Sequence, residues 1–142
     1  MRVNDKPTIL VVDDEPHIVT FLRLYFEQSY HVYEANSGIQ ALLLAKQIKP
    51  DLVIMDTTLP KYDGFHVCGR MKQTPSLKDI PVLLMTLRMS AKDKLDFLRS
   101  GAEDFIAKPF DVHILERRMK RLLAKAQKPK LFEVFNTAEV HV

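Results

Sequence analysis

The sequence predicts an α/β fold in which a parallel sheet is covered by helices on both faces. Three apolar runs, Thr8 to Val12, Leu52 to Met55 and Val82 to Met85, lack the alternation of half-buried strands and indicate strands buried on both sides. Stretches with helical spacing lie between them, and a sheet can cover their apolar stripes. This alternation of strand and helix predicts parallel strands with right-handed crossovers.

The first half of the chain contains two strand-then-helix units. After the strand at 8–12, an apolar stripe from Ile18 to Tyr25 predicts a helix, and a second strand is expected at 30–34. A second helical stripe runs from Ala41 to Ile48. Ser37 can cap this helix at its start, and the Lys49-Pro50 pair closes it.

Three more units complete the chain. The strand at 52–55 is followed by a loop marked by Pro60 and Gly64, and Gly101 ends the fourth helix. We expect the remaining elements at 64–73, 82–85, 91–100, 104–107 and 111–127. Five such units predict a flavodoxin-like, doubly wound (βα)5 sandwich with strand order 2-1-3-4-5.

Length and composition limit the function classes. The chain of 142 residues is the size of one domain, and 46% apolar and 27% charged residues are typical of globular proteins. The apolar runs are far shorter than the roughly 20 residues of a membrane span. The N-terminus has no apolar signal core. We therefore expect a cytoplasmic protein that does not contact membranes.

Two other features of the composition carry less information. Cys68 is the only cysteine, which excludes an internal disulfide and a multi-thiolate metal site. Basic residues crowd near the C-terminus, where the net charge of +3 is concentrated. Such a run can bind nucleic acid, but we favour the interpretation of a solvated helix face.

Polar side chains follow four of the predicted strands. Asp13, Asp14 and Glu15 follow the first strand, and Asp56 follows the third. In the same way, Thr86 follows the fourth strand and Lys108 the fifth. In doubly wound folds, functional groups lie at the carboxyl ends of the strands, near the point where the strand order reverses. These side chains are therefore expected to meet in one crevice.

The chemistry of this set favours phosphoryl transfer. Carboxylates of Asp13, Asp14 and Asp56 at one rim would repel one another unless a hard cation such as Mg²⁺ offset their charge. A carboxylate is also a nucleophile toward phosphorus, a role that suits Asp56. Lys108 can neutralise phosphoryl oxygens, and the Thr86 hydroxyl can donate to them.

The sequence resembles the receiver domains of two-component response regulators over about residues 7–127. The matching motifs are ILVVDDE at 9–15, VIMDTTLPKYDG at 53–64, PVLLMT at 81–86 and GAEDFIAKPF at 101–110. The resemblance implies that Asp56 accepts a phosphoryl group from a sensor histidine kinase or phosphotransfer protein. It also implies that Asp13, Asp14, Asp56 and the Thr58 backbone carbonyl hold Mg²⁺, and that the Lys108–Pro109 peptide is cis.

The resemblance further implies a switch. Thr86 would follow the phosphate, and Phe105 would rotate inward and remodel the face formed by the fourth helix, fifth strand and fifth helix, although Phe105 could equally be a simple core residue. Thr58 and Arg88 occupy positions that tune phosphate lifetime. Leu87 departs from the family's usual small residue and could slow phosphotransfer.

The organisation of the chain follows from the same resemblance. We expect a tail at 1–6, a receiver domain at 7–127, and a segment at 128–142 that is either a tail, able to dock on the domain through its apolar residues, or the start of a linker to an absent output domain. Nucleic acid would be bound only through such an output domain. Two copies could pair through the switching face, with Asp104 and Lys125 as one ion pair.

Two other functions remain in competition. A haloacid-dehalogenase hydrolase also uses an aspartyl phosphate, but it needs a second Asp two residues after the nucleophile, where this chain has Thr58. A pseudo-receiver binds partners without being phosphorylated, and only Leu87 favours it. A nucleotide-binding protein is disfavoured because no glycine-rich phosphate loop is present. We therefore expect a phosphoacceptor that assists its own phosphotransfer and autodephosphorylation, and not an enzyme in the ordinary sense.

Overall fold

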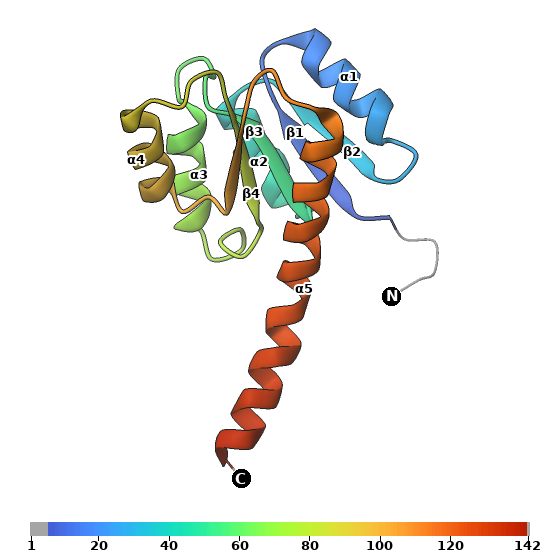
Figure 1. Cartoon of the computed structure of the whole chain (residues 1–142), viewed down its shortest axis with the longest axis vertical. Coiled ribbons are helices and arrows are strands. Elements are labelled where there is room, and N and C mark those ends of the chain that lie inside the picture. Colours follow the sequence, from blue (N-terminus) through green and yellow to red (C-terminus); the bar gives the residue numbers. More distant parts are fainter. Residues whose placement is uncertain (1–5, 142) are drawn as a thin grey trace.

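A computed structural model describes residues 6–141 of the chain, with side chains described for residues 6–126. Strands and helices alternate along this part of the chain (Figure 1). The strands are β1 (Thr8–Val12), β2 (His31–Ala35), β3 (Leu52–Asp56), β4 (Val82–Thr86) and β5 (Asp104–Ala107). The helices are α1 (Pro16–Phe26), α2 (Gly38–Ile48), α3 (Gly64–Lys72), α4 (Ala91–Ser100) and α5 (Val112–His141).

The sheet confirms the predicted doubly wound topology. Its strand order is β2-β1-β3-β4-β5, and all four neighbouring pairs are parallel. Every residue of β3 and β4 is buried, which agrees with the uninterrupted apolar runs from which these strands were predicted. The order reverses at β1, so the crevice lies between β1 and β3 at their carboxyl ends.

Two apolar layers hold the helices on the sheet. One layer includes Val19 and Leu22 of α1 with Leu115 and Met119 of α5. The other layer lies on the opposite face and includes Ala41 of α2 with side chains of α3 and α4. The alternating side chains of each strand supply both layers, because successive residues of a strand point to opposite faces.

The predicted helix ends are confirmed at several positions. The Ser37 side chain caps α2 by accepting a hydrogen bond from the Gln40 N–H, and Lys49 ends this helix in the left-handed conformation. Gly101 ends α4 with a φ of 80°. Ser90 and Asp93 form a reciprocal capping box at the start of α4, which the sequence analysis did not identify.

Some boundaries differ from the prediction. β2 begins at His31 because the Tyr30 N–H still bonds to the Phe26 carbonyl at the end of α1. The largest difference is in α5, which was predicted to end at residue 127 and instead continues through Pro129 to His141. Proline removes one helical hydrogen bond, but helix-forming residues flank it on both sides. The predicted docking of segment 128–142 concerns side chains outside the described ones.

No described helix combines the length and the apolar character that a membrane span needs.

The start of α3 lies unusually close to the end of β3. A Cβ atom on Gly64 would lie 2.2 Å from the Asp56 carbonyl oxygen and 2.9 Å from the Thr57 Cα. The Gly64 N–H donates to the Thr57 carbonyl at 2.9 Å, so the two segments are held together at this point. Only glycine fits here without moving the backbone that carries Asp56.

We expect Gly64→Ala to lower the free energy of unfolding by about 2–3 kcal/mol, because the added methyl group meets backbone atoms that cannot yield. Gly69→Ala is the matched control in the same helix, since a Cβ at Gly69 meets nothing within 4 Å. That control should raise stability by about 0.5–1 kcal/mol through helix propensity alone. Urea unfolding of both variants checks the difference, and equal effects would contradict the close approach.

Candidate functional site

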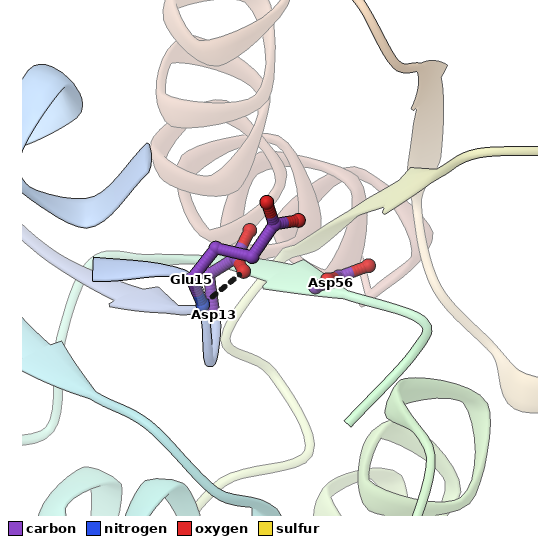
Figure 2. Close-up of side chains that lie close together, drawn as sticks. All are labelled: Asp13, Glu15 and Asp56. Carbon is purple, nitrogen blue, oxygen red and sulfur yellow. Dashed lines mark hydrogen bonds between the residues drawn. The ribbon is translucent and has the colours of Figure 1, made fainter. Parts of the chain in front are cut away.

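Four strand ends place polar side chains at one edge of the sheet. Asp13 follows β1 directly, and Asp56 and Thr86 are the last residues of β3 and β4. Lys108 follows β5 directly. Figure 2 shows the carboxyl groups of Asp13 and Asp56 in this crevice, together with that of Glu15. The parallel sheet therefore brings together residues that are up to 95 positions apart in sequence.

The Lys108 ammonium lies between two buried carboxylates. Its Nζ donates to Asp13 Oδ2 at 2.7 Å and to Asp56 Oδ2 at 3.2 Å. Glu15 Oε1 lies 3.6 Å from the same nitrogen. The Lys108 side chain is only 7% exposed, so these ion pairs are shielded from solvent. The Lys108–Pro109 peptide that follows is cis, as the resemblance implied.

Asp56 has both of its carboxylate oxygens occupied. Oδ1 accepts from the Thr58 N–H at 3.1 Å, and Oδ2 accepts from Lys108. Burial raises the pKa of the Asp56 carboxyl, while the Thr58 hydrogen bond lowers it. The neighbouring Asp13 charge raises the pKa of Asp56 further, and Lys108 opposes this. The outcome is a pKa above the ordinary value for aspartate.

The same contacts act on Lys108 in the opposite sense. Burial alone would lower the pKa of Lys108, but the hydrogen bond and charge of Asp13, with a smaller effect of Asp56, raise it above its ordinary value. Lys108 is therefore a permanent positive charge at neutral pH. Its charge offsets the repulsion between the two buried carboxylates, which would be strongly destabilising without a counterion.

Three carboxylates at this edge have the donor chemistry of a cation site. Oxygen atoms of Asp13, Glu15 and Asp56 all lie within 4.8 Å of one another. An all-oxygen set of this kind fits a hard divalent cation such as Mg²⁺. The Glu15 N–H donates to Asp13 Oδ1 at 3.0 Å (Figure 2), which ties the start of α1 to the cluster.

Two of the three predicted carboxylate ligands lie in the cluster, and the third does not. Asp13 and Asp56 belong to the carboxylate cluster, whereas Asp14 is exposed and lies outside it. Glu15 takes part instead, although the sequence analysis did not select it as a ligand. The run of three acidic residues after β1 was the available signal, but it could not show which of the three side chains point toward Asp56. The Thr58 backbone lies beside Asp56, to which its N–H donates.

The Thr86 side chain is bonded to the backbone of the loop that follows it. The Thr86 hydroxyl donates to the Arg88 carbonyl at 2.7 Å and accepts from the Arg88 N–H at 3.3 Å. It makes no hydrogen bond to Asp56 within the described residues. Leu87, which lies between Thr86 and Arg88 in the sequence, is 63% exposed, and Arg88 is exposed as well.

Phe105 packs partly buried beside α4. Its ring meets that of Phe97 edge to face, with centroids 4.5 Å apart. On the other side of β5, the Arg118 guanidinium donates to the Phe105 carbonyl and lies 3.5 Å from Asp104. Asp104 is thus paired with Arg118 within its own chain, and its pairing with Lys125 of a second copy stays a prediction.

Comparison with known proteins agrees with this geometry. The family model of the response regulator receiver domain matches residues 9–120. The DNA-binding dual master transcriptional regulator RpaA of Synechocystis is 40% identical over 123 residues, covering 86% of this chain and 51% of the regulator. The chain spans about half the length of the curated regulators of this kind that it matches.

Solved structures extend the likeness to the fold. The signal receiver domain of a histidine kinase from Syntrophus aciditrophicus superposes with a TM-score of 0.80 at 33% identity, covering 86% of this chain and 93% of that one. The receiver domain of the sensor histidine kinase PA1611 from Pseudomonas aeruginosa has a TM-score of 0.78 at 27% identity, covering 84% and 99%. That second structure has a magnesium ion coordinated in its active-site cleft.

We expect Lys108→Met to lower the free energy of unfolding by about 3 kcal/mol at neutral pH, because it leaves two buried carboxylates without a counterion. In acid, protonation of Asp56 removes the repulsion and the deficit should shrink. In the wild type, the pKa of Lys108 is raised above its ordinary value of 10.5. The stabilisation of the fold by Lys108 is therefore complete below pH 10.5 and is lost as the pH rises through the pKa of the folded state.

The matched control is Lys92→Met. Lys92 is 86% exposed and lies 3.9 Å from Asp96, so its removal should change stability by less than about 0.5 kcal/mol. Chemical denaturation across a pH series distinguishes the two variants. A Lys108→Met deficit that does not change with pH would argue against carboxylate repulsion as its cause.

Proposed function

This chain belongs to the response-regulator receiver family, and on that premise we propose that it is a signalling switch phosphorylated on Asp56. The observation that carries the proposal is the Lys108 ammonium held between Asp13 and Asp56 at 2.7 and 3.2 Å. A carboxylate in hydrogen-bond contact with a buried cation can attack phosphorus while the charge on the transferred group is neutralised.

Asp56 is the proposed acceptor because of its position and contacts. It ends β3, so the sheet fixes its backbone, and Gly64 allows α3 to approach behind it. One carboxylate oxygen would form the new O–P bond while the P–N bond of the donor's phosphohistidine breaks and its imidazole leaves, and the Lys108 ammonium would stay beside the phosphoryl oxygens. A sensor histidine kinase or a phosphotransfer protein is the proposed donor.

Mg²⁺ is the proposed cofactor, and the carboxylate cluster supports it. The predicted ligands are Asp13, Asp14, Asp56 and the Thr58 carbonyl, to which the observed position of Glu15 adds a candidate. When bound, the ion would offset the negative charge of the transferring phosphoryl group. Asp13, which accepts from Lys108 through Oδ2, would then also help to hold the ion.

Thr86 and Phe105 are the proposed switch residues. The Thr86 hydroxyl must leave the Arg88 carbonyl before it can donate to a phosphoryl group. That change would release the loop 87–89 and alter the space in which Phe105 packs on Phe97. We infer that phosphorylation shifts the population between two packings of the α4-β5-α5 face.

The output of the switch follows from the same face. We propose that the receiver domain occupies residues 7–127 and acts in the cytoplasm on an output domain or partner. Pairing of two copies through α4-β5-α5 remains one proposal for this step. The intrachain pair of Arg118 with Asp104 would then have to open or be shared.

Incubation with Mg²⁺ and acetyl phosphate should add one phosphoryl group to the chain, as measured by intact-protein mass spectrometry. Asp56→Ala should abolish the gain because the nucleophile is lost. Asp79→Ala removes an exposed carboxylate distant from the site and should label normally. If the wild type gains no mass and does not bind beryllofluoride, the chain is a pseudo-receiver and the proposal is wrong.

The exposed loop after β4 is proposed to control the rates. Leu87→Ala should speed labelling by acetyl phosphate severalfold, because Leu87 lies beside the path to Asp56. Leu98→Ala, which truncates a leucine that is 73% exposed on α4, is the matched control. After donor removal, Arg88→Ala should change the rate of phosphate loss, as should substitution of Thr58. Wild-type rates in these variants would contradict the proposal that this loop controls phosphorylation and phosphate loss.

A further inference from the structure

The outer side of α5 carries a row of cations. Arg117, Lys120, Arg121 and Lys125 are all exposed, and we call these four the α5 basic stripe. Arg117, Lys120 and Arg121 lie on the helix side away from Leu115, Met119 and Leu122, which are buried against the sheet, and Lys125 lies at the flank of that side. Helical periodicity places residues four apart on one side, so the row runs along the helix axis.

The stripe is poorly neutralised by its own helix. Lys120 has only a long contact to Glu116, at 3.9 Å, and the other three cations pair with no carboxylate of residues 6–126. Residues 112–126 contain five Lys or Arg and one Glu, whereas the whole chain carries +3. Like charges four residues apart on a helix repel one another.

Neighbouring elements add little negative charge. Glu27, which follows α1, and Glu34 of β2 are both paired with Arg23, at 3.6 and 2.7 Å. On β5, Asp104 is paired with Arg118. The acidic groups of Asp13, Glu15 and Asp56 lie at the carboxyl ends of the strands, where Lys108 contacts them. The outer side of α5 therefore remains strongly positive.

We propose that the α5 basic stripe binds the phosphate backbone of nucleic acid without sequence preference. From Arg117 to Lys125 the helix rises about 12 Å, a length over which duplex DNA carries roughly seven phosphates. Contact with several of them would release counterions and relieve the repulsion within the stripe. This inference is independent of the phosphorylation of Asp56.

The same surface is a poor match for a membrane. A helix that lies in a bilayer interface turns an apolar face toward the lipid. The apolar side of α5 is already covered by the sheet, and Ile114 is the large apolar residue left exposed among residues 112–126. Binding through α5 must therefore be dominated by charge, which favours a rigid polyanion.

The test is fluorescence anisotropy of the full chain with a labelled DNA duplex over a series of salt concentrations. Four phosphate contacts predict a slope of log K against log salt between about −3 and −4. Arg117→Gln with Arg121→Gln should reduce the size of this slope by about 2 and weaken binding at low salt at least tenfold. Gln keeps the helix propensity, and circular dichroism checks the fold.

The matched control is Lys46→Gln with Lys94→Gln, which removes the same charge from exposed positions on α2 and α4. It should bind nearly as the wild type does. Equal losses in the two double variants would overturn the proposal in favour of net charge alone. Absence of DNA binding at low salt would also overturn it, whether or not vesicles rich in anionic lipid are bound. A strong preference between unrelated duplexes would contradict contact with the backbone only.

Discussion

The contact of Lys108 with Asp13 and Asp56 is the interaction on which the rest of the site depends. Two carboxylates that are almost fully buried could not both stay ionised at this distance without a cation between them. Lys108 supplies that cation from the end of a third strand. The ion pairs therefore join the ends of β1, β3 and β5, and the Lys108 charge opposes the rise in the Asp56 pKa that burial causes.

The sheet provides the rigidity that this arrangement requires. Strands buried on both faces cannot shift without exposing apolar side chains, so their carboxyl ends stay in register. The close approach of Gly64 to the Asp56 carbonyl adds a second restraint on the Asp56 backbone. By contrast, the Thr86 hydroxyl bonds only to the Arg88 backbone among the described residues, although the Thr86 backbone is fixed at the end of β4, where its carbonyl accepts from the Lys108 N–H. The strand ends thus fix the backbone of both residues, while the orientation of the Thr86 hydroxyl depends on the loop that follows β4.

Charge is divided between two regions of the molecule. The carboxyl ends of the strands gather acidic groups around one lysine, and the outer side of α5 gathers cations with few partners. The two regions lie on different elements, and Glu34 and Asp104 are paired with Arg23 and Arg118. A domain with nearly balanced overall charge can therefore present an acidic site and a basic surface at once.

The sequence by itself determined the strand and helix order, the sheet topology and most helix ends, because apolar runs, Ser37 and Gly101 act locally. It also placed Asp13, Asp56 and Lys108 in one crevice, since parallel strands end at one edge. Only the tertiary structure decided that Glu15 points into the carboxylate cluster while Asp14 does not, that Thr86 bonds to Arg88, and that Asp104 pairs with Arg118. The direction of a loop side chain depends on contacts with elements distant in sequence, and no local pattern encodes those contacts.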